Sequence, residues 1–438
     1  MKNARTLSFL GLLLVAALIS LAVACGGGKA TGNAEATATV TPEPTATGYP
    51  TPTPAPPLPA TSTVALVPVT APPDGDYETA LYVADVSTGD TFKVETVAGS
   101  VLSPRAWVSP TQLMTYAFSE SDHSLYLLDL STKTLRRLPG SADDSAVSFS
   151  HSGGLMTNTT PGGELLIWRV SDGQEVTRLD VGPIGYVLWA PDDKHIYWPG
   201  VPSGIASVSP EPHVVPVDTG ATDRDVSWFS DGSGVALADA QGIFSFNADS
   251  GEKKLLYSWP PGSAVDPSFI KLSPDGKYAL SGMGAAGFRA LVVPLSGGTE
   301  GIQITVVEAE DAQWSPTEDA VATVADFCTP GSRLLLVNAD GSIRSTIDSQ
   351  PWLQIPRFSA DGSLIAYVGQ GPQEKGMQDQ YGITVRKAEG GDSLVSFIAG
   401  FSDTEYWSPD GHWLAYTPTL MTSHCVSDLG NTQILPFP

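Results

Sequence analysis

The sequence predicts an all-β fold, a single β-propeller of four-stranded blades. Three observations predict it. A short phrase recurs eight times, with its central Ser or Ala at positions 109, 150, 190, 230, 273, 315, 359 and 408. Each repeat of 40 to 49 residues contains apolar runs separated by turn residues. No helical pattern interrupts the repeats, which argues against a parallel α/β sheet. A period of this length made of short strands is typical of blades in a radial array.

The recurring phrase, termed the box, places a large apolar residue before Ser or Ala and then a Pro, Asp or Gly turn. The boxes begin at Trp107, Phe149, Trp189, Phe229, Leu272, Trp314, Phe358 and Trp407. Gly accepts a positive φ in such turns, and Asp bonds its own backbone. We therefore interpret Asp275, Asp361 and Asp410 as turn formers rather than metal ligands. The box tryptophans, which precede the turns, are expected to pack between blades.

Each repeat carries a second turn signal about 20 residues after the box. Residues 125–128, for example, precede Ser131-Thr132, and residues 334–337 precede Asn338-Ala339-Asp340-Gly341. Each unit therefore reads strand, tight turn, strand, looser loop, strand, tight turn, strand. In a propeller the tight turns gather on one face, the tight-turn face, and the connecting loops gather on the opposite, loop face.

Three boxes resemble the TolB-type, WD-repeat-like propeller repeat. They lie at 272–279, 358–367 and 407–416, the last reading Trp407-Ser408-Pro409-Asp410-Gly411. The resemblance covers roughly residues 80–438 and implies the fold; such repeats occur in binding proteins, periplasmic scaffolds and the lids of some peptidases. The first, fourth and sixth boxes depart from the pattern because they lack the Gly, the Pro or both.

Eight boxes favour eight blades, with seven as the alternative. An additional hairpin, 80–86 with 91–97, precedes the first box. This hairpin would complete the last blade by strand exchange, which would leave part of the C-terminal tail as surplus.

The N-terminus has the pattern of a secretory signal. Lys2 and Arg5 precede an apolar run over 7–23 that ends in small residues before Cys25. Cys25 with the following glycines resembles a bacterial lipoprotein cleavage site. We expect a signal peptide over 1–24, a lipidated Cys25, and an exported protein anchored to a bacterial membrane, in the periplasm or at the cell surface. Ordinary cleavage after Ala24 and an uncleaved anchor are the alternatives.

Residues 25–75 are rich in Pro and Thr, and the sequence predicts a disordered stalk here, followed by the propeller domain over 76–438. The chain has 23 basic and 47 acidic residues, a net charge of −24. The charges of the first 75 residues cancel, so the negative charge belongs to the propeller. Nucleic-acid binding is therefore excluded as a function class.

Cys328 and Cys425 remain if Cys25 is lipidated, and both fall in looser loops of their repeats. In an oxidising compartment they are candidates for a disulfide. One blade separates them, while bridged Cα atoms must come within about 7 Å. Paired and unpaired states therefore both stay open.

The loops that lead into the innermost strands carry twelve acids and one base, Arg224. The candidate binding residues among them are Asp143, Asp144, Asp223, Asp225, Glu308, Glu310, Asp311, Asp403 and Glu405; Asp180, Asp266 and Asp348 complete the set. A ring of one charge sign raises the local cation concentration. We expect the channel mouth to recruit a basic peptide segment, an amine-bearing ligand or Ca²⁺. Solvated loop charges without a partner are the alternative.

The longest insertion within a repeat spans 370–381 and contains Met377 and Tyr381. Departures from the repeat length are typical of loops on the binding face, so these two residues are candidate contacts. A tolerated surface insertion is the alternative interpretation.

The sequence contains no assembled catalytic motif: no nucleophile elbow, no HExxH and no phosphate-binding loop. We therefore expect a non-catalytic, monomeric binding scaffold without a cofactor, Ca²⁺ aside, whose partner is an extracytoplasmic protein or glycan. A carbohydrate-binding or polysaccharide-processing propeller is the main alternative, because Trp352 and Tyr381 could stack on sugars.

A quinone-dependent dehydrogenase is a further alternative, because the turn at Asp85-Val86-Ser87-Thr88-Gly89 resembles the repeat of that class. However, the tryptophan that follows this turn in that class is absent.

Overall fold

The computed structural model describes residues 62–69, 80–96, 101–118, 124–141, 147–160, 162–200, 202–217, 226–260, 269–283, 289–295, 302–304, 312–326, 331–351, 353–370, 381–398, 406–417, 426–428 and 431–433. These ranges all fall in one compact unit, Ala55–Pro438. Their regular elements are β-strands, and they contain no helix of the length and apolarity needed to cross a membrane. The expected signal peptide, Cys25 and most of the expected stalk lie outside the described residues.

Six separate sheets have four antiparallel strands each. The first is β8 (Ser148–Phe149), β9 (Leu155–Thr159), β10 (Glu164–Arg169) and β11 (Glu175–Asp180), and the second is β12 (Leu188–Trp189), β13 (His195–Trp198), β14 (Gly204–Ser207) and β15 (Val214–Pro216). The third is β16 (Val226–Trp228), β17 (Gly234–Ala238), β18 (Gly242–Asn247) and β19 (Lys253–Ser258), and the fourth is β20 (Ile270–Leu272), β21 (Tyr278–Met283), β22 (Arg289–Pro294) and β23 (Ile302–Ile304). The fifth is β24 (Gln313–Trp314), β25 (Ala320–Ala325), β26 (Arg333–Asn338) and β27 (Ile343–Ser349), and the sixth is β28 (Gln354–Phe358), β29 (Leu364–Gln370), β30 (Tyr381–Lys387) and β31 (Val395–Ile398).

A nine-stranded sheet joins the two ends of the series. One half is β4 (Val101–Ser109), β5 (Gln112–Phe118), β6 (Ser124–Asp129) and β7 (Thr134–Ser141). The other half has the order β32 (Tyr406–Trp407), β33 (Trp413–Tyr416), β2 (Tyr82–Asp85) and β3 (Thr91–Thr96). With the six separate sheets, this gives one four-stranded group for each box. A separate two-stranded sheet is formed by β34 (Val426–Asp428) and β35 (Asn431–Gln433).

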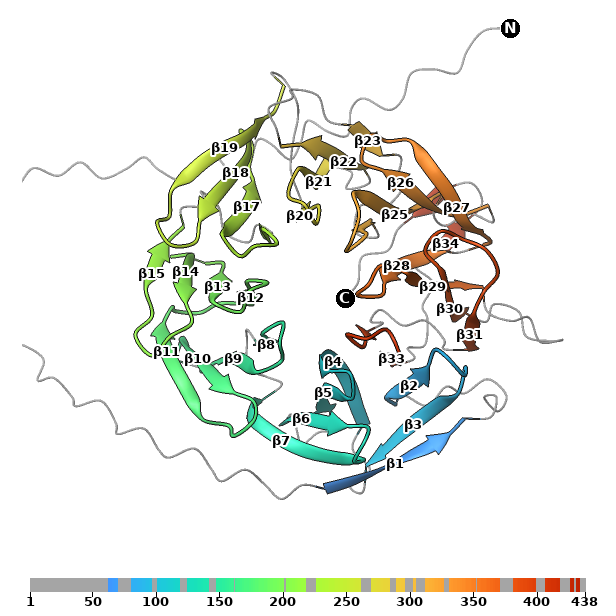
Figure 1. Cartoon of the computed structure of the whole chain (residues 1–438), viewed down its shortest axis with the longest axis horizontal. Helices are drawn as coiled ribbons and strands as arrows, with labels where there is room; N and C mark the ends of the chain where they lie inside the picture. The colour runs from blue at the N-terminus through green and yellow to red at the C-terminus, as the bar shows by residue number, and fades with distance from the viewer. Residues whose placement is uncertain are drawn as a thin grey trace, which may run out of the picture. The chain divides into compact units, whose positions relative to one another are not determined.

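The N-terminal hairpin β2–β3 completes the group that contains the last box. Tyr82 pairs with Tyr416 and Asp85 with Trp413 in an antiparallel register. The rings of Tyr82 and Tyr416 stack with centroids 5.6 Å apart. This is the strand-exchange closure that the hairpin before the first box suggested. The chain is therefore an all-β propeller, with the box-leading strands innermost in each group and the fourth strands outermost (Figure 1).

The structure differs from the sequence-based expectation at residues 62–68, which fall inside the predicted stalk. They form strand β1 (Ser62–Pro68), which pairs with β3 along Val64–Pro68 and with β7 at Ser62 and Thr63. Val64 is buried among side chains of the flanking groups. The stalk prediction used the average Pro and Thr content of a long window. That average hid a short run of β-branched residues with strand alternation.

The box turns show why Ser, Asp and Gly recur in them. In the last box the Ser408 hydroxyl donates to Asp410 Oδ1 at 2.6 Å and accepts from the Trp413 backbone N–H at 2.8 Å. Gly411 has a φ of 70°, a backbone conformation that residues other than Gly, Asn and Asp rarely adopt. The Ser273–Asp275 and Ser359–Asp361 pairs make the same bond. These aspartates are turn formers, as predicted.

The core lies between neighbouring groups. Trp189, for example, packs with Leu165 and Ile167 of the preceding sheet and with Ile196 of its own. Trp314 packs in the same way with Leu280 and Val292. The predicted packing of box tryptophans between blades is confirmed at these positions.

Candidate functional site

Most of the sequence-predicted site residues lie outside the described residues. These are Cys25, Asp143, Asp144, Asp223, Asp225, Glu308, Glu310, Asp311, Asp403, Glu405, Met377, Cys328 and Cys425. Trp352 and Asp266 also lie outside. Tyr381 is described only as the first residue of β30, paired with Gln370 of β29.

The structure describes two acids of the predicted loop set, Asp180 and Asp348, and their surroundings differ. Asp180 ends β11 and is exposed. Asp348 near the end of β27 accepts a 2.5 Å hydrogen bond from Tyr367 Oη and lies 3.3 Å from Arg386 Nη2. Arg386 Nε also donates to Tyr367 Oη at 2.7 Å. Burial and the bond to Asp348 raise the pKa of Tyr367 well above its usual range. Asp348 therefore links two neighbouring sheets, and its charge is paired with that of Arg386.

The tight-turn face is joined by polar contacts between groups. The Asp193 carboxylate accepts two hydrogen bonds from the preceding box, one from the His151 backbone N–H at 2.6 Å and one from the Ser152 backbone N–H at 2.8 Å. His195 Nε2 lies 3.3 Å from Asp249 Oδ1 of the following sheet. Within the closing group, His412 Nε2 lies 3.3 Å from Asp85 Oδ2. These three histidines have structural partners.

The turn at Asp85 also has a structural explanation. Asp85 Oδ1 accepts hydrogen bonds from the Ser87 N–H at 2.8 Å and from the Thr88 N–H at 3.2 Å. Asp129 Oδ1 makes the same contacts with Ser131 and Thr132. The Asp-x-Ser-Thr pattern therefore shapes the turn between the third and fourth strands. These local hydrogen bonds give the residues of the turn a structural role.

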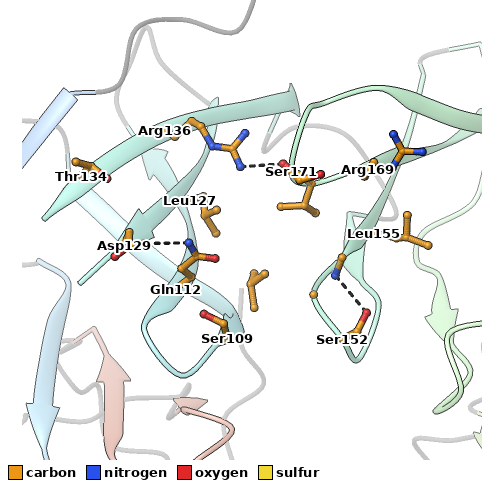
Figure 2. A pocket seen from close by; sticks show the side chains of 14 residues that line it. Ser109, Gln112, Leu127, Asp129, Thr134, Arg136, Ser152, Leu155, Arg169 and Ser171 are labelled. Carbon is orange, nitrogen blue, oxygen red and sulfur yellow. Dashed lines mark hydrogen bonds between the residues drawn. The ribbon is translucent and has the colours of Figure 1, made fainter. Parts of the chain in front are cut away.

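A cleft of about 730 Å³ opens between the β4–β7 group and the β8–β11 sheet. It lies on the tight-turn face, since it includes Ser109 and Ser152–Gly154 of the first two boxes (Figure 2). Arg136, Arg169, Gln112 and Asp129 supply its polar lining. Its apolar lining comes from Val108, Leu127, Leu155 and Val170.

The polar side chains of this cleft are arranged by local bonds. Gln112 Nε2 donates to Asp129 Oδ2 at 2.9 Å. Burial raises the pKa of Asp129, but the hydrogen bonds from Ser131, Gln112 and Thr132 outweigh this and lower it to about 2. Arg136 Nη2 reaches from β7 across to the Val170 carbonyl oxygen at 2.8 Å (Figure 2). Arg169 instead pairs with Asp172 at 2.8 Å.

Sequence reasoning did not find this cleft. Its residues come from two repeats and from both turn types, so no contiguous motif contains them. The available signal was the second box, where His151-Ser152-Gly153-Gly154 replaces the usual Pro-Asp-Gly. This signal indicates a different turn, but it does not reveal the arginine opposite.

No family model and no curated protein matches the sequence. Among solved structures, the chain is similar to the eukaryotic initiation factor, at 11% identity and a TM-score of 0.50, over 76% of this chain and 88% of that one. It is also similar to the C-terminal WD40 domain of Sif2, at 16% identity and 0.49, over 73% and 97%. A third similar structure is Chaetomium thermophilum Sqt1 bound to the N-terminus of ribosomal protein L10, at 13% and 0.48, over 78% and 97%. At these identities the likeness concerns the fold alone.

Proposed function

We propose that this protein is a lipid-anchored, extracytoplasmic propeller that binds a protein partner and acts as a non-catalytic scaffold. The anchor rests on the N-terminal sequence: basic residues, the apolar run over 7–23, and Cys25 followed by glycines. The Pro- and Thr-rich segment that follows would separate the propeller from the membrane.

The observation that carries the binding function is the way neighbouring groups are joined. Innermost strands are tied by indole-to-carbonyl bonds, such as Trp407 Nε1 to the Arg357 oxygen at 3.0 Å. On the tight-turn face, carboxylates such as that of Asp193 hold the adjoining box. A frame joined this way holds its connecting loops in fixed relative positions. Such loops carry most binding sites in proteins.

The described polar side chains support binding more than catalysis. Box serines and aspartates bond to their own turns, and His195 and His412 lie against aspartates. A reactive set needs a nucleophile, a base and an orienting group at one site. The polar groups described above are instead engaged in turns and in contacts between sheets.

The loop face is the proposed contact surface, with a cationic segment of the partner as its target. The contacts would come from the acids Asp143, Asp144, Asp223, Asp225, Glu308, Glu310, Asp311, Asp403 and Glu405, together with Met377 and Tyr381. A single-sign charge ring attracts a basic segment and increases its association rate.

Site-specific photo-crosslinking on intact cells tests this function. A photoreactive residue replaces Gln241, which is exposed in the turn between β17 and β18 on the loop face. The matched control replaces Lys277, which is exposed in a box turn on the opposite face. We expect one protein to be captured from position 241 and not from 277, with less capture at high salt. Equal capture from both faces, capture of glycan alone, or no light-dependent product would overturn the proposal.

A further inference from the structure

We propose that the cleft between the β4–β7 group and the β8–β11 sheet is a binding site for a carboxylate attached to an apolar group, with Arg136 as the anion-binding residue. This inference goes beyond the scaffold function. The cleft lies on the tight-turn face. It would bind an anion, whereas the acidic loops of the opposite face would bind a cationic segment.

Arg136 differs in its partners from most arginines of the described ranges. Five of those arginines pair with carboxylates: Arg169, Arg178, Arg333, Arg344 and Arg386. The guanidinium of Arg136 makes one hydrogen bond, from Nη2 to the Val170 carbonyl oxygen. Its Nη1 is buried without a partner. Within the described residues, this charge therefore has no counter-ion.

Arg136 is half-buried and its Nη1 is removed from solvent, which makes the missing counter-ion informative. Desolvation lowers the pKa of Arg136. Transfer of an unpaired charge out of water is unfavourable, so such groups are normally paired or hydrogen-bonded. A guanidinium has five N–H donors that match a carboxylate in geometry. A bound carboxylate would supply the charge and the acceptors that are missing.

The acid inside the cleft does not serve as this counter-ion. Asp129 Oδ1 accepts from Ser131 and Thr132, and its Oδ2 accepts from Gln112. Both of its oxygens are therefore engaged. The charge of Arg169, on the other wall, is balanced by Asp172. Among the described residues no carboxylate forms an ion pair with Arg136, and a single guanidinium favours one carboxylate over a phosphate dianion.

The side chains that line the walls indicate that the rest of the ligand is apolar. Val108, Leu127, Leu155 and Val170 line the cleft beside the charged group. Its volume, about 730 Å³, lies within the range of small-molecule sites. Gly153 has φ of 68°, and a Cβ there would lie 2.3 Å from the Val108 carbonyl oxygen. The two groups therefore approach closely at this point of the cleft, where only Gly fits.

Calorimetry on the full chain, kept in detergent because of its apolar N-terminal run, tests the proposal. The probes are 3-phenylpropionate and its neutral analogue 3-phenylpropionamide. We expect the acid to bind at least about tenfold more tightly than the amide, and Arg136→Gln to remove that preference. Arg178→Gln, at a carboxylate-paired arginine of the β8–β11 sheet outside the cleft lining, is the matched control and should keep the preference. Unfolding curves establish that both variants fold.

A peptide that ends in a phenylalanine carboxylate, measured beside the free acid, distinguishes a protein terminus from a small organic acid as the source. Tighter binding of either one supports the site. Equal affinity for acid and amide, an undiminished preference in folded Arg136→Gln, or no binding to the wild-type protein overturns it. None of these results depends on the outcome of the crosslinking experiment, which probes the opposite face.

Discussion

The indole Nε1 of Trp314 donates a 2.9 Å hydrogen bond to the backbone carbonyl oxygen of Lys271, in the innermost strand of the preceding sheet. Trp407 makes the same contact with Arg357 at 3.0 Å, and Trp228 makes it with Leu188 at 3.2 Å. Each bond crosses from one sheet to its neighbour. Trp314 and Trp407, which are box residues, and Trp228 therefore join their sheets by directed bonds as well as by packing.

Replacement of Trp314 separates these two contributions. Trp314→Phe keeps most of the apolar contact but removes the donor to the Lys271 carbonyl. We expect a loss of about 1–2 kcal/mol in the free energy of unfolding, measured by urea denaturation. Trp314→Ala also creates a cavity and should cost about 3–5 kcal/mol. Equal stability of Trp314→Phe and the wild type would show that the hydrogen bond contributes nothing.

The Asp193 carboxylate should make a pH-dependent contribution to stability. Burial raises its pKa, but hydrogen bonds from Ser152 and His151 outweigh this, so the folded value lies below 3.8. Asn tolerates the φ of 58° at this position but offers one acceptor oxygen and no charge. We expect Asp193→Asn to lose about 1.5–3 kcal/mol at neutral pH.

The sign of the pH effect follows from the lowered pKa. The stabilisation is fully present above the unfolded value of 3.8 and is lost as the pH falls through the folded value. The difference in unfolding free energy between wild type and Asp193→Asn should therefore stay constant near neutrality and shrink in acid. Urea denaturation at a series of pH values measures it. A difference that grows toward low pH would contradict the assignment.

Strand β1 should stabilise the closure. Deletion of residues 1–61 keeps β1 and should leave the melting temperature unchanged, whereas deletion of 1–69 should lower it. Val64→Ala offers a finer test, because Val64 is 7% exposed and Val67 on the same strand is 37% exposed. We expect a cost of about 2 kcal/mol for Val64→Ala and little effect for Val67→Ala. Similar losses in the two variants would mean that β1 contributes through its backbone alone.

The proposed anchor gives a prediction about Cys25. Cys25→Ser removes the thiol that would be acylated, and stable membrane attachment needs more than one acyl chain. We expect the variant to move from the membrane fraction to the soluble fraction and to lose palmitate labelling. A variant that stays with the membrane would indicate that the apolar run over 7–23 is retained as an uncleaved anchor.

Features encoded within one repeat were predictable from the sequence. The Ser408, Asp410 and Gly411 turn is specified by neighbouring residues, and the spacing of such turns predicted the sheets between them. The predicted hairpin over 80–86 and 91–97 corresponds to β2 and β3, because alternation and turn residues are local signals.

Features made by contact between repeats were not predictable in the same way. The hydrogen bond from the Ser152 backbone N–H to Asp193 forms because two turns of different repeats lie side by side. The spacing of residues within one repeat does not predict such a contact. The Arg136 cleft escaped notice for the same reason. Strand β1 was missed because composition averaged over a long window conceals a short strand. The acidic loops, which the sequence did single out, lie mainly outside the described residues.

The pairing of β2 with β33 also has a consequence for biosynthesis. Asp85 and Trp413 lie more than 300 residues apart in the sequence, so the ring cannot be closed until the strand that contains Trp413 has been synthesised. Until then the nascent chain carries β2 with an open edge, to which another polypeptide can add. A premature stop before residue 413 would leave that edge permanently open and mark the product for chaperones and proteases.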